Sequence, residues 1–358
     1  MKSKSETETA AKAEAEAEGT AARSESVNEK GNGDGTSQTG SGALFEMYNS
    51  SSSSSSEAIQ PCADGGVDAD DVPLVLQDMN HMVWTRSLKK ISEGAFSTVF
   101  LGMSDDGVQV AIKFIPRLRR DIAQESLEKE MEVASMLHHP NIVRYVSCSL
   151  STSYLAIIME YVPGGSLHSV VKKFGKVSAL VARRFTIDIL NGLNYLHGIG
   201  IVHCDVKPHN VLLDTDGVCK LSDFGSTISE AADVARTAGG EMTLRGTALY
   251  MAPEVAAGGR CTPQSDIFSL GISLLEMLLG RLPWCWSDKA PERDDPMALC
   301  ALMNRDVLFV QSLARGYLEV EIPDSIGHEA ALFVRACCHP DPAMRPSALE
   351  LLSYLFVM

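Results

Sequence analysis

Four polar side chains in the middle of the chain have the types and the spacing that transfer of a phosphoryl group requires. The run His203–Asn210 contains a carboxylate (Asp205), an ammonium (Lys207) and an amide (Asn210), and a second carboxylate, Asp223, follows thirteen residues later. Phosphoryl transfer needs an acceptor for the proton of the attacking hydroxyl, a cation beside the transferred group, and oxygen ligands for Mg²⁺. These residues could fill those roles in that order. An isolated Asp or Asn is usually a surface loop residue, so the prediction depends on the joint spacing.

The elements that must position these groups begin at about Thr85, where the sequence changes to a pattern of short strands. The segment Leu88–Gly102 alternates and turns like a strand, a glycine-bearing loop and a second strand. By itself this segment could equally be an ordinary hairpin. Val110–Lys113 follows at strand spacing, and the segment Gln124–Leu137 is predicted to be helical. Farther along, the chain is predicted to be mostly helical, with a helix at about Ser178–His197.

Three of these motifs together resemble those of eukaryotic protein kinases: the run His203–Asn210, the triplet Asp223–Gly225, and the strand Val110–Lys113. The resemblance implies an α+β fold with two lobes, a small β-rich N-lobe at about residues 83–161 and a larger α-helical C-lobe at about residues 162–358. It also implies ATP and Mg²⁺ as cofactors. The lysine two residues after Asp205 is typical of kinases that modify serine and threonine rather than tyrosine.

The resemblance assigns a role to each polar group of the central motif. Asp205 would orient the acceptor hydroxyl and take its proton, and Lys207 would neutralise charge on the transferred phosphoryl group. Asn210 and Asp223 would hold Mg²⁺, which prefers hard oxygen ligands.

Nucleotide binding is assigned to the strands that come before this motif. Lys113 would reach the α- and β-phosphates and would be held by an ion pair with Glu130, because the competing Glu132 falls on the other face of the predicted helix. Of the three glycines usual in the phosphate loop only the middle one, Gly94, is present. The other predicted contacts are the loop residues Ile91, Ser92, Glu93, Gly94, Ala95, Phe96, Ser97, Thr98 and Val99, and the adenine-pocket residues Ala111, Met159, Glu160, Val162 and Leu212.

Other matching residues are expected to hold the fold rather than to react. His203 should pack under Phe224, and Asp266 should anchor the backbone of the loop that carries Asp205. Arg345 should form a buried ion pair with Glu254, and removing one partner of such a pair costs about 3–5 kcal/mol.

Cys204 departs from the family pattern, because an arginine usually precedes the catalytic aspartate. That arginine normally pairs with a phosphorylated residue of the activation loop and orders the loop. Cysteine cannot form this ion pair, so we hypothesise that activity depends less on loop phosphorylation than in kinases that have the arginine. Candidate phosphorylation sites remain at Ser226, Thr227, Ser229, Thr237 and Thr243.

Within the kinases, the chain is most similar to MAP kinase kinase kinases of the MEKK/Ste11 type, which phosphorylate MAP kinase kinases. The similarity lies in the loop around Gly94 and in the segments Arg245–Val255, Leu282–Trp284 and Asp341–Pro346. Ste20-like kinases are the alternative family. The alternative function is a catalytically weak pseudokinase that scaffolds a cascade, which the altered phosphate loop and Cys204 would favour and the intact catalytic residues oppose.

The first 82 residues differ in composition from the kinase-like region, residues 83–358. They contain −10 of the formal net charge of −15, with a run of seven serines from Ser50 to Ser56, and are predicted to be a disordered tail that could recruit a scaffold or regulator. The acidic balance argues against a nucleic-acid partner. The chain lacks a signal peptide or an apolar run of membrane-spanning length, so we predict a cytoplasmic protein with no membrane insertion. The resemblance to kinases implies a protein substrate.

Overall fold

The computed structural model describes residues 72–94, 97–116, 137–229, 246–291 and 296–358. By its contacts the chain divides into two units, Met1–Ser56 and Glu57–Met358, and every described residue belongs to the second. Three of the predicted site residues, Ala95, Phe96 and Glu130, lie outside the described residues, as does most of the predicted tail.

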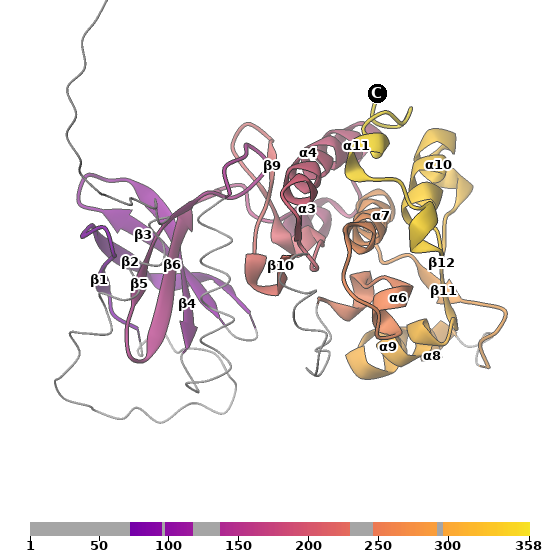
Figure 1. Cartoon of the computed structure of the whole chain (residues 1–358), viewed down its shortest axis with the longest axis horizontal. Coiled ribbons are helices and arrows are strands. Elements are labelled where there is room, and N and C mark those ends of the chain that lie inside the picture. The colour runs from indigo at the N-terminus through magenta and orange to yellow at the C-terminus, as the bar shows by residue number, and fades with distance from the viewer. Residues whose placement is uncertain (1–71, 95–96, 117–136, 230–245, 292–295) are drawn as a thin grey trace, which may run out of the picture. The chain divides into compact units, whose positions relative to one another are not determined.

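An antiparallel sheet of six strands forms the N-terminal part of the described chain (Figure 1). In spatial order the strands are β1 (Val75–Gln77), β2 (Val83–Glu93), β3 (Thr98–Ser104), β4 (Gln109–Pro116), β6 (Tyr154–Glu160) and β5 (Tyr145–Leu150). Successive side chains of a strand point to opposite faces, and one face of β3 and β4 is buried around Phe100 and Phe114, whose rings meet edge to face at 5.8 Å. Gly102 lies within this packing, where a Cβ would approach Ile112 Cδ1 to 2.4 Å.

The sheet begins inside the segment that was predicted to be a tail. Strand β1 pairs with β2, with Val75 opposite Thr85, and Leu76 is buried. The Asp78 carboxylate then accepts hydrogen bonds from the Trp84 indole N–H at 2.9 Å and from the backbone N–H of Met82 at 2.9 Å. The predicted boundary after residue 82 is therefore wrong. A strand of three residues is too short to give a periodic signal in the sequence.

The remainder of the described chain is mainly helical (Figure 1). Its α-helices are α3 (Leu167–Phe174), α4 (Ala179–Gly198), α6 (Pro253–Ala256), α7 (Pro263–Leu279), α8 (Pro296–Met303), α9 (Asp306–Ala314), α10 (His328–Cys337) and α11 (Ala348–Leu351). The predicted helix at about 178–197 is α4, and the Ser178 side chain caps it by accepting a hydrogen bond from Val181 N–H. The α+β fold with two lobes is thus confirmed.

Helix α7 is the centre of the helical part. Every residue from Ser265 to Leu278 is buried, and α4 and α10 pack against the helix. Its start is well defined, because Thr262 and Ser265 form a reciprocal capping box and Pro263 occupies the first turn. It ends at Gly280, whose φ of 74° is the left-handed conformation that glycine adopts without strain.

Short strand pairs hold the loops that carry the polar motif. They are β7 (Ile201–Val202) with β10 (Ile228–Ser229) and β8 (Val211–Leu213) with β9 (Cys219–Leu221). A further pair, β11 (Trp284–Trp286) with β12 (Leu318–Val320), comes between α7 and α10 in the chain. The residues from His203 to Lys207 lie between β7 and the 3-10 turn Pro208–Asn210, and Asp223 follows β9.

Within the described ranges, no single helix is long and apolar enough to span a membrane. One pair of helices bent by 112°, Met297–Met303 with Asp306–Ala314, has sufficient length and apolar composition when the two are taken together.

Candidate active site

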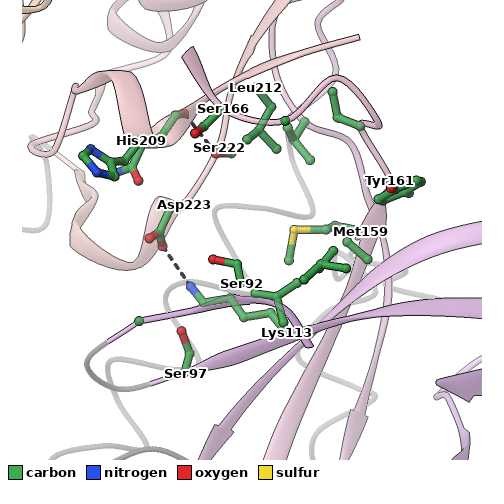
Figure 2. Close-up of a pocket in the computed structure, with 18 of the residues that line it drawn as sticks. Ser92, Ser97, Lys113, Met159, Tyr161, Ser166, His209, Leu212, Ser222 and Asp223 are labelled. Carbon is green, nitrogen blue, oxygen red and sulfur yellow. Dashed lines mark hydrogen bonds and ion pairs between the residues drawn. The ribbon is translucent and has the colours of Figure 1, made fainter. Parts of the chain in front are cut away.

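A cavity of about 720 Å³ is lined by residues of both the sheet and the helical part. This volume lies in the range of about 300–1,000 Å³ that is usual for small-molecule sites. The predicted nucleotide-binding residues that line it are Ile91, Ser92, Glu93, Gly94, Ser97, Val99, Ala111, Lys113, Met159, Glu160, Val162 and Leu212. Of the central motif, Lys207, Asn210 and Asp223 line the same cavity. Residues separated by more than a hundred positions in the sequence therefore face one space (Figure 2).

Thr98 is the one described residue of the predicted loop that does not line the cavity. Its side chain is only 1% exposed, because strand β3 turns it to the face opposite that of Val99.

Gly94 is not required by the packing of the described chain. Its N–H donates to the carbonyl of Ser97 at 2.8 Å, which closes the loop between β2 and β3. A Cβ at this position would meet Ser97 Oγ at 3.5 Å, an ordinary contact. The described chain thus leaves room for a small side chain at position 94, and because Gly94 lines the cavity a ligand could approach its backbone closely.

Lys113 and Asp223 meet on the wall of the cavity (Figure 2). The Lys113 Nζ atom lies 2.8 Å from Asp223 Oδ1. Burial of the Asp223 carboxyl acts to raise its pKa, but the nearby Lys113 ammonium outweighs this effect and holds the pKa of Asp223 below the ordinary value. The Asp223 side chain is 48% exposed, so its second oxygen remains accessible to a ligand. Asp223 has a φ of 62°, which is uncommon for a residue other than glycine and turns the side chain out of the line of β9.

The Asp205 carboxylate is the centre of a hydrogen-bond network. Its Oδ2 atom accepts from Lys207 Nζ at 2.7 Å and from Asn210 Nδ2 at 2.9 Å. Its Oδ1 atom accepts from the N–H of Thr247 at 2.9 Å and from its hydroxyl at 2.8 Å. Lys207 also donates a short hydrogen bond to the Thr247 hydroxyl. These bonds thus hold the two carboxylate oxygens in fixed directions, which a group that accepts a proton from a substrate requires.

Asp266 holds the backbone beneath this network. Its carboxylate accepts from the N–H groups of His203 and Cys204, each at 2.8 Å, and lies 2.9 Å from His197 Nε2. Cys204 has a φ of 65°, so the loop is sharply turned where these bonds hold it. Since Asp266 is 1% exposed, its charge is compensated almost entirely by these partners. The predicted anchoring role is confirmed.

The His203 imidazole is buried and supports the loop from within. Its Nδ1 accepts from the N–H of Asp205 at 3.3 Å, so Nε2 bears the hydrogen and donates to the carbonyl of Ser222 at 3.0 Å. Its ring lies 5.4 Å from that of Phe224. The predicted packing under Phe224 is confirmed.

The predicted ion pair between Arg345 and Glu254 is confirmed as well. The guanidinium makes two hydrogen bonds to the carboxylate, at 2.6 and 2.8 Å, and donates to the carbonyl of His339 at 2.8 Å. The Arg345 side chain is fully buried, so the pair fixes the segment around Glu254 to the C-terminal end of the chain.

His209, which lines the cavity, and Glu276, which does not, had no predicted role. His209 stacks on His168 with ring centroids 3.7 Å apart, and burial together with this neighbour lowers the pKa of His209 to about 4, which leaves it neutral at pH 7. Burial raises the pKa of the Glu276 carboxyl, which accepts a 2.6 Å hydrogen bond from Tyr250. Nothing in the sequence spacing signals these contacts, because they join residues far apart in the chain.

Comparison with known proteins identifies one matching family and many similar relatives. A family model described as "Protein kinase domain" matches residues 85–357. The chain is 34% identical to "Mitogen-activated protein kinase kinase kinase ANP1" of Arabidopsis thaliana over 289 residues, which are 78% of this chain and 41% of the relative. It is 35% identical to "Mitogen-activated protein kinase kinase kinase A" of Dictyostelium discoideum over 288 residues, 78% of this chain and 28% of the relative. For "Mitogen-activated protein kinase kinase kinase 19" of Homo sapiens the identity is 32% over 289 residues, 79% of this chain and 20% of the relative. The matched part of the chain thus spans between 20% and 41% of the length of these relatives.

Proposed function

The chain belongs to the protein kinase domain family, and from this premise we propose that it transfers the γ-phosphate of ATP to serine and threonine hydroxyls of proteins. The observation that carries the proposal is the network around Asp205. A carboxylate, an ammonium and a threonine hydroxyl are joined there beside a cavity of suitable size for a nucleotide. Phosphoryl transfer depends mainly on positioning and on electrostatic stabilisation, which such a network supplies.

The nucleotide would lie between the sheet and the helical part. Ala111 and Leu212 would contact the adenine from opposite sides, and the backbone of Glu160 and Val162 would hydrogen-bond its edge. Lys113 and the loop residues 91–99 would hold the phosphates. These assignments are supported because all the described residues among them, except Thr98, line one cavity. Glu130 would pair with Lys113, as the family resemblance implies.

The donor set of Asn210 and Asp223 fits Mg²⁺. Among the described residues, no group of three or more His, Cys, Asp or Glu side chains could hold a metal ion. Asn210 and Asp223 both line the cavity and offer oxygen ligands, and Mg²⁺ in kinases is shared between such residues and phosphate oxygens. When bound, Mg²⁺ would neutralise phosphate charge.

The chain's own residues would carry out the proton transfer and the charge compensation. Asp205 would accept the proton of the substrate hydroxyl, and its hydrogen bonds with Asn210 and Thr247 would orient its carboxylate for this transfer. Lys207, which already contacts Asp205 and Thr247, would stabilise charge on the transferred group.

We further propose that the substrate is a MAP kinase kinase. The names of the three similar relatives support this cascade level over a Ste20-like kinase, and the described catalytic residues oppose a scaffold without activity. The compartment is proposed to be the cytoplasm, and the N-terminal tail is proposed to contact a scaffold or regulator of the cascade.

The test is transfer of labelled phosphate from Mg·ATP to a panel of MAP kinase kinases and to a generic basic protein. We expect transfer selective for a MAP kinase kinase, and a fall of about 10²–10⁴-fold when Asp205→Ala removes the proton acceptor. Asp105→Ala, a change of the same type in an exposed turn between β3 and β4, should leave the rate unchanged. Transfer to the basic protein alone would refute the proposed substrate class. A wild-type protein that binds nucleotide but transfers no phosphate would refute the proposed kinase activity.

A further inference from the structure

The Glu160 side chain lies at the end of β6, where it contacts two segments of the chain. Its Oε1 atom lies 2.8 Å from Lys220 Nζ, and its Oε2 atom accepts a hydrogen bond from the N–H of Arg144 at 3.2 Å. The backbone adds a third connection, because Glu160 N–H donates to the carbonyl of Arg144 at 2.8 Å. Both carboxylate oxygens of Glu160 are therefore engaged, although the family pattern assigns a function only to its backbone.

Lys220 belongs to β9, the strand that leads directly to Asp223. Only three positions separate the two residues, and β9 itself is three residues long. The Lys220 side chain is 15% exposed and that of Glu160 is 27% exposed. A pair that is this far removed from water is screened less by solvent than a surface pair, so it can restrain both backbones.

The same strand is also fixed to the segment that enters β5. Val143 N–H donates to the carbonyl of Leu221 at 2.9 Å, and Leu221 N–H donates to the carbonyl of Asn141 at 2.8 Å. The Asn141 side chain donates to the carbonyl of Cys219 at 3.0 Å. These bonds hold β9 on its backbone side, and the Glu160–Lys220 pair is a side-chain link from β9 to the end of β6.

We propose that Glu160 and Lys220 are positioning residues, whose ion pair holds β9 against the end of β6 so that Asp223 stays within reach of Lys113 and of Mg·ATP. The inference rests on the proposed function, because it assigns Asp223 to the bound metal and nucleotide. Since the backbone bonds of β9 remain when the pair is removed, its loss should leave the fold intact and shift Asp223. The effect should therefore appear in the binding of Mg²⁺-bound nucleotide more than in that of nucleotide alone.

The experiment is a double-mutant cycle of Glu160→Gln and Lys220→Met. We expect each single variant to raise KM for Mg·ATP about fivefold, and the double variant to be no worse than either single one. Lys220→Arg keeps the charge and should restore most of the affinity. Arg281→Met breaks a pair with Glu321 whose side chains are 54% and 39% exposed, and this control should leave KM unchanged.

Equilibrium binding of a non-hydrolysable ATP analogue, measured with Mg²⁺ and with EDTA, separates this inference from the proposed function. We expect the variants to weaken binding with Mg²⁺ and to leave binding in EDTA nearly unchanged, whether or not the protein transfers phosphate. The inference would be overturned if the effects of the two single variants on binding were additive, or if Lys220→Arg bound as weakly as Lys220→Met. An equal loss of affinity in EDTA would also overturn it. Absence of transfer by the wild-type protein would overturn only the proposed function.

Discussion

The loop His203–Asn210 and the glycine-bearing loop Ile91–Val99 face the same cavity with different kinds of support. The first is held by the buried Asp266 carboxylate and by the network around Asp205. The described residues of the second are joined by strand pairing and by the bond from Gly94 N–H to Ser97. We infer that the chain itself fixes the groups proposed to react, whereas a bound nucleotide would complete the loop proposed to cover the phosphates.

Removing the charge of Asp266, which supports the first loop, should cause the largest loss of activity. In Asp266→Asn, at least one of the two backbone N–H groups loses a charged acceptor, and a hydrogen bond to a charged group contributes about 1.5–3 kcal/mol. We expect kcat to fall roughly 10- to 100-fold, with KM for ATP changed little. Steady-state kinetics test this, with Asp105→Asn as the matched exposed control. An unchanged kcat per folded molecule would mean that Asp266 only stabilises the fold.

Cys204→Arg should convert the first loop to the arrangement usual in the family. A phosphorylated residue of the activation loop could then form a charge-assisted hydrogen bond with the new guanidinium, so phosphatase treatment should lower the activity of the variant roughly tenfold. The wild-type protein should lose much less. Activity before and after phosphatase treatment measures both. Equal sensitivity of the two proteins would contradict the hypothesis that Cys204 reduces the dependence on phosphorylation.

Two glycine substitutions should distinguish the open loop from the packed sheet. Gly94→Ala adds a methyl group that meets only an ordinary contact in the chain, so stability should change by less than about 0.5 kcal/mol while KM for ATP rises roughly fivefold. Gly102→Ala forces Ile112 to move and should destabilise the fold by about 1–3 kcal/mol. Thermal unfolding of both variants measures the change in stability, and steady-state kinetics measure KM for ATP. Equal KM values for Gly94→Ala and the wild type would show that the nucleotide does not approach Gly94.

The smallest expected effect concerns the pH dependence of stability at Asp223. Because its folded-state pKa lies below the ordinary value of about 3.9, the carboxylate stabilises the fold above that pH, and the contribution is lost as the pH falls through the folded-state pKa. The side chain is half exposed, so Asp223→Asn should cost less than about 1 kcal/mol at pH 7. Urea unfolding at pH 7 and at successively lower pH should show the two proteins converging. A difference that grows toward acid pH would contradict this.

Sequence motifs predicted the parts of the site that depend on local spacing. The positions of Asp205, Lys207 and Asn210 follow from one short loop, and the roles of Asp266 and of Arg345 with Glu254 follow from the family pattern. Motifs did not predict contacts between residues distant in the chain that carry no motif of their own. The Glu160–Lys220 pair joins residues sixty positions apart, and the stacking of His168 on His209 depends on how α3 packs.

The long helix predicted at about Ser178–His197 is confirmed, whereas the one predicted at Gln124–Leu137 lies almost entirely outside the described residues. Helix α4 has a capping serine and twenty residues, enough for a clear pattern. Strand β1 has three residues and was missed. Thr98 was included with the loop because of its position in the sequence, although the alternation of β3 turns its side chain away from the cavity.

Hydrogen exchange with and without a non-hydrolysable ATP analogue and Mg²⁺ tests the comparison of the two loops most directly. We predict that amides of the segment Ile91–Val99 gain protection on binding, while those of His203 and Cys204, already bonded to Asp266, change little. Protection gained equally in both segments, or only in the second, would contradict the claim that the chain itself fixes the reacting loop and leaves the phosphate loop to the nucleotide.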